Sequence, residues 1–465
     1  MKKICLLLLS LLLLTCTKEK KPLSNSQPFS ESISEIDSAY IAKRVINFTL
    51  ENNKISPKGI ATFVNMFQNS QFVVFGEKHN SKQTALLTNA LIPIMHKLGY
   101  NNICFEVGPY SAKKLTELST PHNNTVKNLY DFNNEFGYPE FNRRPIPFFS
   151  GIEDAEFLKT ASEYNMNIIG LDQEHIYSAK FLFNELLKLA NNNPKIHEIT
   201  ASKIKADSIV NYWLAIDKQT NGKQDVFTTL LNDDDINKFF DSFSSKDTVA
   251  FKIIEDLKIS WDIYSHWQTS HLDRVSYMRN NFLKHYQQIT KNKNESKFFL
   301  KFGQAHASQQ LSNGAYDLGY FVNEIAKSNN TKSVNINSWI RFQKRGDSIV
   351  DNSIRRTYSR LGMFIGFGKI DEYTMIDLKS IRNDVQNGII SLPNNGDYTT
   401  LEPNGSLFLK YSLDLRSLTD SYSSIGKKKN NDFGIYSIQV RYTDDFLLKK
   451  NAITKLESNT VKVTY

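Results

Sequence analysis

The sequence predicts an α/β fold: a mainly parallel sheet flanked by helices, with a large helical insertion and a small C-terminal antiparallel β element. The first observation is a strand–helix–strand pattern over residues 71–108, where short apolar runs at 72–75 and 102–107 enclose a helical period. The second is the return of such runs later in the chain, first at 166–175. The third is the region 178–288, whose pattern is almost wholly helical.

Each element of the first unit has a local signal. The run 72–75 is apolar and β-branched at its centre, as expected of a strand buried on both faces. Ser81 can cap the following helix, and Gly99 stands where a C′ glycine would end it. Ser56-Pro57 predicts an earlier helix, because proline is favoured at the first helical position. The two strands should run parallel, so that their carboxyl ends meet at one sheet edge.

Residues 109–147 contain five prolines with many aromatic residues between them. This composition predicts an irregular excursion over the strand ends. So many aromatic residues are typical of a lid or a pocket wall rather than of a linker.

The second half of the chain repeats the alternation. An apolar run at 298–302 is followed by glycine, histidine and a helical period, and runs at 333–339 and 373–378 bring the predicted sheet to about six strands. Near the C-terminus, alternating apolar and polar residues predict half-exposed antiparallel strands, as in the runs 407–413, 435–442 and 461–465.

The N-terminus predicts a bacterial lipoprotein signal peptide. Two lysines precede an apolar run too short for a permanent membrane-spanning helix, and Leu-Leu-Thr directly before Cys16 resembles a lipobox. We expect lipidation of Cys16; an ordinary secretory signal is the alternative. The predicted organisation is a signal peptide at 1–15, a flexible tether at 16–36, an α/β domain at 37–388 and a β-rich element at 389–465.

The composition is that of a globular protein and argues against a nucleic-acid-binding function. Hydrophobic residues make up 40% and charged residues 23% of the chain. The net charge of +9 comes from lysines spread along the whole sequence, so no basic stripe suited to nucleic acid forms. Of the three cysteines, Cys5 leaves with the signal peptide and Cys104 lies in a predicted core strand, so no disulfide is expected.

The residues that carry chemistry follow predicted strands. The sequence has no GxSxG nucleophile elbow, no GxxxxGK phosphate loop, no HExxH and no paired CxxC. It does contain GxxH twice, ending in His79 and in His306, each time directly after a predicted strand, and Glu77 and Glu106 also lie at strand ends. Two imidazoles and two carboxylates around one opening could activate water or hold a divalent metal; two separate loop-capping histidines are the alternative.

The sequence resembles the superfamily that joins erythromycin esterases, TIKI and TraB-type metalloproteases and ChaN-like haem-binding lipoproteins. The resemblance lies in the order and context of four segments: the GEKH turn at 76–79, the Glu106 strand, the helix with Arg274 and the GQAH turn at 303–306. The resemblance covers roughly residues 55–340.

The resemblance implies roles for these residues that differ between the branches. The esterase branch implies that Glu77, His79 and His306 activate water without a metal, while Arg274 binds or polarises the substrate. The TIKI branch implies a metal site formed by His79, Glu106 and His306.

Weaker candidates lie near the predicted site. Asp172, at a strand end, is expected to orient a histidine or Arg274. His175 is expected on a surface loop, with a place in the pocket wall as the alternative. His266 and His271, five residues apart, are expected on different faces of one helix, so we do not expect them to form a metal-binding pair.

Together these observations predict a lipoprotein of the cell envelope, anchored to a membrane after export. It is expected to hydrolyse an ester, lactone or peptide bond in a small-molecule or peptide substrate. The rival is a ChaN-like protein that binds haem or metal without turnover, and a third alternative is a scaffold without catalysis. The expected cofactor, if there is one, is a divalent metal ion rather than haem.

Overall fold

The computed structural model describes residues 34–391 and 405–410, apart from short internal gaps. These gaps fall at 142, 223, 244–246, 267–268, 292–295, 310, 313–314, 346–347, 355–361 and 371. The predicted signal peptide, Cys16, most of the tether and the predicted strands 435–442 and 461–465 lie outside the described residues. Within the described part of the chain, no helix is long and apolar enough to span a membrane.

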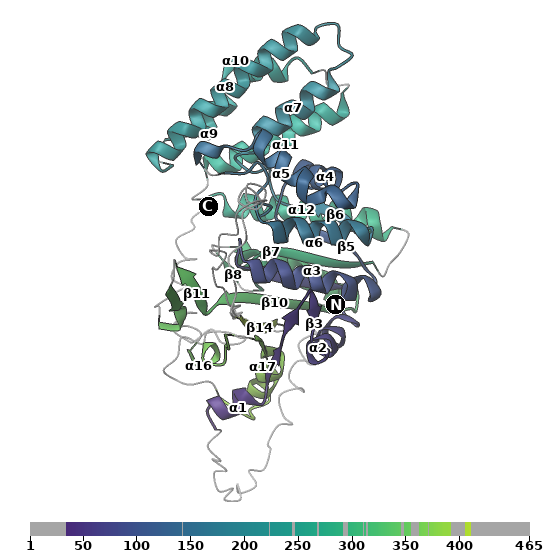
Figure 1. The fold of residues 1–465 in the computed structure, drawn as a ribbon, viewed down its shortest axis with the longest axis vertical. Helices are drawn as coiled ribbons and strands as arrows, with labels where there is room; N and C mark the ends of the chain where they lie inside the picture. The colour runs from purple at the N-terminus through teal and green to yellow at the C-terminus, as the bar shows by residue number, and fades with distance from the viewer. Residues whose placement is uncertain are drawn as a thin grey trace, which may run out of the picture.

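An eight-stranded sheet forms the centre of the molecule (Figure 1). In spatial order its strands are β1 (Val45–Phe48), β13 (Tyr373–Asp377), β14 (Gly405–Lys410), β10 (Ser333–Ile340), β4 (Phe72–Glu77), β7 (Lys297–Gly303), β5 (Tyr100–Phe105) and β6 (Asn167–Gly170). The strands from β14 to β6 run parallel to their neighbours. Strand β13 pairs antiparallel with β14 and with β1. The predicted α/β fold with a mainly parallel sheet is therefore confirmed.

The strands of the first predicted unit, β4 and β5, are parallel but not adjacent. Strand β7 lies between them and pairs with both. The two GxxH turns consequently leave neighbouring strands, and Glu77 at the end of β4 is paired in register with Gly303 at the end of β7.

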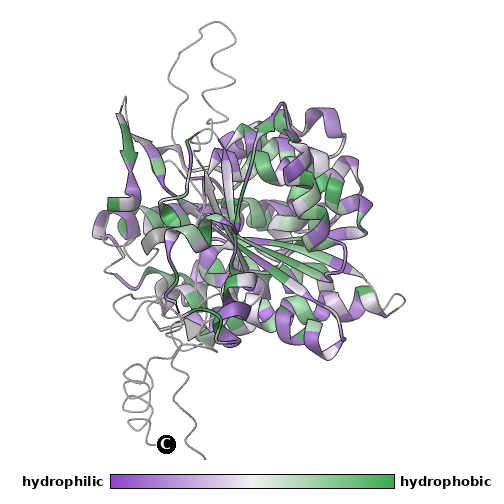
Figure 2. Ribbon diagram, turned by 90° about the horizontal axis from the view of Figure 1, so that it is seen from below, coloured by the Kyte–Doolittle hydropathy of each residue, from purple (hydrophilic) through white to green (hydrophobic). Residues whose placement is uncertain are grey.

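Helices cover both faces of the sheet, because residues of each central strand alternate between two apolar cores. Phe72 and Val74 belong to the core formed with α12 and α14, whereas Val73 and Phe75 belong to the core formed with α2, α3 and α6. Figure 2 shows apolar residues gathered on the strands and on the helix faces turned toward them. The covering helices are α2 (Pro57–Phe67), α3 (Lys82–Lys97), α6 (Ile152–Glu163), α12 (His271–Thr290) and α14 (Leu318–Ser328).

The predicted ends of α3 are present in the structure. The Ser81 hydroxyl accepts a hydrogen bond from the Thr84 backbone N–H at 3.4 Å, which satisfies one of the free donors at the helix start. Gly99 follows the helix with φ +88°, a conformation that glycine adopts at little cost.

The predicted helical insertion forms a separate layer on one side of the sheet, at the top of Figure 1. Its interior is aromatic: Phe183 contacts Phe239, Phe240 and Trp261 edge-on. The helices are α7 (Ala179–Leu189), α8 (Ile196–Thr220), α9 (Val226–Leu231), α10 (Asp234–Phe240) and α11 (Thr248–Ser265).

The prediction of an irregular excursion over residues 109–147 is wrong. Most of this stretch is helical, in α4 (Pro109–Leu118), α5 (Thr125–Phe136) and two short 3₁₀ turns. Pro109 is the first residue of α4, Pro121 directly precedes the turn His122–Asn124, and Pro139 begins the turn Pro139–Phe141. These three prolines mark the starts of helical segments, where a missing N–H and a fixed φ carry no penalty.

The described part of the predicted C-terminal β element is β14, which is an internal strand of the main sheet. The remaining elements lie around the sheet edges. They are α1 (Ser38–Ala42), α13 (Gln304–Ala307), α16 (Gly362–Ile365), α17 (Leu378–Gln386), the 3₁₀ turn Asn352–Ile354 and the strand pairs β2 (Leu50–Glu51) with β3 (Lys54–Ile55), β8 (Leu311–Ser312) with β9 (Ala315–Tyr316) and β11 (Phe342–Arg345) with β12 (Ser348–Asp351).

Candidate active site

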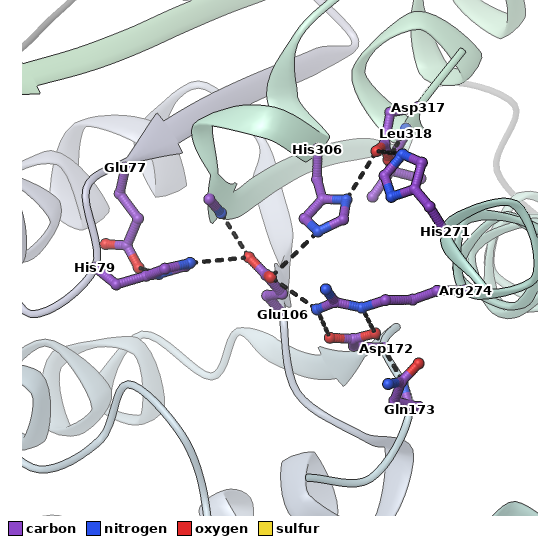
Figure 3. A network of polar contacts seen from close by, with 11 residues as sticks. Glu77, His79, Glu106, Asp172, Gln173, His271, Arg274, His306, Asp317 and Leu318 are labelled. Atoms are coloured by element: carbon purple, nitrogen blue, oxygen red, sulfur yellow. Dashed lines mark hydrogen bonds and ion pairs between the residues drawn. The ribbon is translucent and has the colours of Figure 1, made fainter. Parts of the chain in front are cut away.

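The predicted site residues form one polar network at the carboxyl ends of β4, β7 and β5 (Figure 3). Glu77 ends β4, Glu106 follows the last residue of β5, and His306 lies in the short helix α13 directly after β7. Gly303 makes this convergence possible, because a Cβ at that position would lie 2.7 Å from His79 Nε2 and 3.2 Å from Glu106 Oε2.

Glu106 is the central carboxylate of the network and is 5% exposed. Its Oε1 accepts from Arg274 Nη2 at 2.9 Å and lies 3.4 Å from His306 Nε2. Its Oε2 accepts from the Gly303 backbone N–H at 2.6 Å and lies 3.6 Å from His79 Nε2. Burial would raise the pKa of this carboxyl, but the neighbouring side chains of His306, His79 and Arg274 hold it well below its usual range.

His79 is held on three sides and remains partly open to solvent. Its Nδ1 lies 3.1 Å from Glu77 Oε1, its Nε2 faces Glu106, and 30% of its side chain is exposed. The ring of Phe148 stacks on the imidazole at 3.8 Å between centroids and 11° between planes. Phe148 adopts φ +63°, which is unfavourable for a bulky residue, so the fold holds this ring against His79 at a cost in backbone strain.

Glu77 is charged because a buried lysine pairs with it. The Lys301 ammonium contacts Glu77 Oε2 and lies 5.1 Å from the centre of the Phe157 ring. Burial would raise the pKa of Glu77, but Lys301 and then His79 lower it below its usual value. Nearby Asp154 shows the opposite balance, since burial raises its pKa well above the usual range despite Lys301.

His306 is enclosed by two carboxylates and is 5% exposed. Its Nδ1 lies 2.8 Å from Asp317 Oδ2, and its Nε2 faces Glu106. Burial would lower the pKa of His306, but Glu106 and Asp317 raise it to about 10. The imidazole is therefore a buried cation at neutral pH.

Asp317 also contacts a second histidine. His271 Nε2 lies 3.6 Å from Asp317 Oδ2, and the His271 ring lies nearly parallel to that of His306 with 6.1 Å between centroids. His271 therefore belongs to the network, a role that the sequence did not lead us to expect. His266 directly follows α11 and His271 begins α12, so the two histidines do not share a helix as their spacing led us to expect.

Arg274 enters the network from α12 and is paired with Asp172. Its Nε donates to Asp172 Oδ1 at 2.9 Å and its Nη2 donates to Asp172 Oδ2, a bidentate arrangement that fixes the plane of the guanidinium. The same Nη2 reaches Glu106. Asp172 is thus in contact with Arg274, one of the two partners considered for it.

Of the residues that follow Asp172, Glu174 is buried and His175 is half-buried, so His175 is not the exposed surface histidine that we expected. Desolvation of its ring, with the charges of Arg143 and Arg274, lowers its pKa to about 3. Glu174 accepts hydrogen bonds from the backbone N–H groups of Tyr110 and Ser111 at 2.7 and 3.1 Å, at the start of α4. Burial raises the pKa of Glu174 to about 7.

Lys301, Asp317 and His271 were missed by sequence reasoning. A signal existed only for Lys301, because a lysine inside an otherwise apolar strand run needs a buried partner. Asp317 and His271 stand outside any motif, and only the packing of α12 against α14 and α13 brings them to His306.

A cavity of about 720 Å³ adjoins the network, between α12 and the helical insertion. Arg274 and His271 line it on the side of the network, and Phe227 and Tyr264 line it on the side of the insertion. Its mixed apolar and polar wall and its size are typical of a small-molecule pocket.

The donor set does not fit a divalent ion on His79, Glu106 and His306. The two histidines face different oxygens of Glu106, and the Arg274 guanidinium and the Gly303 N–H already bind those oxygens. Both ring nitrogens of His306 already face carboxylates, Nδ1 at 2.8 Å from Asp317 Oδ2 and Nε2 at 3.4 Å from Glu106 Oε1. Among the residues that the structure describes, no group of three or more His, Cys, Asp or Glu side chains is arranged to hold a metal.

Tyr264 is the one tyrosine among the described residues that line this cavity, and burial together with the negative charge of Asp172 raises the pKa of its phenol.

No protein-family model and no curated protein matches the chain. Distant similarity exists to solved structures. An erythromycin esterase in its open conformation is 14% identical, with 72% of this chain and 90% of that chain covered and a TM-score of 0.43. A Bacillus cereus protein is 14% identical, with coverage of 74% and 86% and a TM-score of 0.45. A succinoglycan biosynthesis protein is 12% identical, with coverage of 82% and 93% and a TM-score of 0.44.

An erythromycin esterase is thus among the solved structures to which the chain is distantly similar. Similarity at this level does not transfer an activity.

Proposed function

We propose that this chain is a hydrolase in which His79 activates water for attack on an ester, lactone or peptide carbonyl. The observation that carries the proposal is the clamped and partly exposed ring of His79, with one carboxylate facing each ring nitrogen. A histidine held in this way has a defined tautomer and orientation, as a general base requires.

The tautomer follows from Glu77. Of the two carboxylates only Glu77 lies within hydrogen-bond distance of the ring, at 3.1 Å from Nδ1, whereas Glu106 Oε2 is 3.6 Å from Nε2. A carboxylate held in its charged form by Lys301 can only accept a hydrogen bond, so in the proposed resting state Nδ1 carries the proton and Nε2 keeps its lone pair. A water beside Nε2 would donate one proton to His79 and would also lie within reach of Glu106 Oε2. When His79 takes the proton, the imidazolium is stabilised by the carboxylates of Glu77 and Glu106.

Arg274 supplies the positive charge for the carbonyl oxygen. It lines the cavity and binds Glu106, so a substrate bound in the cavity would meet a guanidinium whose other partner is the carboxylate that faces His79. The bidentate pair with Asp172 holds the guanidinium in one plane before substrate arrives, which favours transition-state stabilisation over mere binding.

The predicted lipid anchor at Cys16 extends this proposal to location. A lipidated chain would hold the hydrolase at a membrane of the cell envelope and confine it to substrates that reach that compartment. The tether predicted at 16–36 would let the domain stand away from the bilayer.

The test compares His79→Asn with His285→Asn, a histidine on α12 in the same fold but outside the network. Purified proteins are assayed on panels of p-nitrophenyl esters, alkyl esters, lactones and fluorogenic peptides. We expect His79→Asn to lower kcat/KM by about 10²- to 10⁴-fold and His285→Asn to leave it unchanged. Equal activity of the two variants, at equal circular dichroism, would contradict the role of His79.

A further inference from the structure

The position of His271 carries an inference that goes beyond water activation. His271 and Arg274 lie one turn apart at the start of α12 and both line the 720 Å³ cavity. Figure 3 shows both side chains extending from that helix toward the network. A substrate that places its carbonyl near Arg274 would therefore bring the departing part of the molecule into reach of His271.

His306 is poorly suited to serve as a proton donor for a leaving group. Both of its ring nitrogens face carboxylates, Asp317 at 2.8 Å and Glu106 at 3.4 Å, and the side chain is almost wholly buried. Its charge instead stabilises the two carboxylates between which it lies. His271 faces the same Asp317, 18% of its side chain is exposed, and its ring forms part of the cavity wall.

We propose that His271 is the general acid that protonates the leaving group of the reaction, with Asp317 as the buried carboxylate that stabilises its protonated form. This inference rests on the proposed hydrolase function. It divides the two proton transfers between two histidines, His79 on the side of the water and His271 on the side of the leaving group, each paired with its own carboxylate.

The proton balance closes with water alone. His79 takes one proton from the attacking water, whose oxygen forms the new bond to the carbonyl carbon. The bond from that carbon to the leaving oxygen or nitrogen then breaks, and the His271 imidazolium gives its proton to the leaving atom. His271 regains a proton from solvent through the cavity, and His79 releases one to solvent.

The test uses the dependence of rate on the leaving group. Two esters with the same acyl group are compared, one releasing p-nitrophenolate, which departs without protonation, and one releasing an alkyl alcohol, which needs a proton. His271→Asn should lower kcat for the alkyl ester by about 10²- to 10³-fold and should change kcat for the aryl ester by less than about threefold. The matched control, His285→Asn, should change neither rate.

The results of this test distinguish a failure of the acid role of His271 from a failure of the proposed hydrolase function. Equal losses on both esters, or no loss on either, in a protein whose activity still depends on His79 would overturn the acid role of His271 alone. If the wild-type protein hydrolyses no substrate of the panels, the proposed function falls and the role of His271 falls with it. Unchanged circular dichroism and thermal midpoint of His271→Asn establish that a selective loss is not caused by unfolding.

Discussion

Replacing Lys301 by Met tests the electrostatic support of the site most directly. Lys301 is 5% exposed and Glu77 is 6% exposed, and the ammonium is the counterion of that carboxylate. Methionine keeps most of the volume of the lysine stem, so the change removes a charge with little loss of packing.

The magnitude follows from the burial of the pair. Removing one partner of a buried ion pair costs about 3–5 kcal/mol of the free energy of unfolding, and His79 remains as a partner of Glu77, so we expect a loss of about 3 kcal/mol at pH 7.5. The control Lys327→Met breaks a surface pair with Glu324, whose side chains are 59% and 44% exposed, and should cost about 0–1 kcal/mol.

The loss should also depend on pH. Lys301 holds the pKa of Glu77 below its usual value of about 4.5, so in the wild type this carboxylate contributes stability that is complete above that value and is lost as the pH falls through the lowered pKa. Without Lys301, burial is opposed by His79 alone and the pKa of Glu77 should rise above that value. The deficit of the variant should therefore begin as the pH rises through the lowered wild-type pKa and should grow until the pH exceeds the raised pKa of the variant, so it should be smaller at pH 5 than at pH 7.5.

Urea unfolding followed by circular dichroism at the two pH values measures the deficit. The double variant Glu77→Gln with Lys301→Met should recover part of the loss, because it removes the unpaired charge. A deficit no larger than that of Lys327→Met, or one equal at both pH values, would refute the idea that Lys301 keeps Glu77 charged.

Three further predictions concern other parts of the molecule. Glu174→Gln should flatten the dependence of the free energy of unfolding on pH. Burial raises the pKa of Glu174 from 4.5 to about 7, so the wild type should lose about 3 kcal/mol as the pH rises through that window. In urea titrations at several pH values, the control Glu324→Gln should lose stability with pH as the wild type does. Cys16→Ser should move the full-length protein from the membrane to the soluble fraction, and unchanged partitioning would contradict the lipid anchor. Purified protein should show no Soret band on haem titration and no loss of hydrolysis after chelation; tight stoichiometric haem binding without turnover would favour the rival binding function.

The sequence alone determined the strands that carry the site and the residues at their ends. The apolar runs of β4, β5 and β7 and the glycines of the two GxxH turns are local signals, and side chains at the carboxyl ends of parallel strands meet at one edge whatever the strand order. Glu77, His79, Glu106 and His306 could for this reason be expected together, and the structure brings them together.

Tertiary structure alone decided the rest. The insertion of β7 between β4 and β5 depends on pairing between distant segments, which no local period encodes. The same holds for His271 and Asp317: their side chains meet because α12 packs beside α14, and no local pattern in the sequence predicts this contact. Contacts between residues on different elements depend on how apolar faces pack together, so the partners of His306 and Glu77 emerge only in the folded chain.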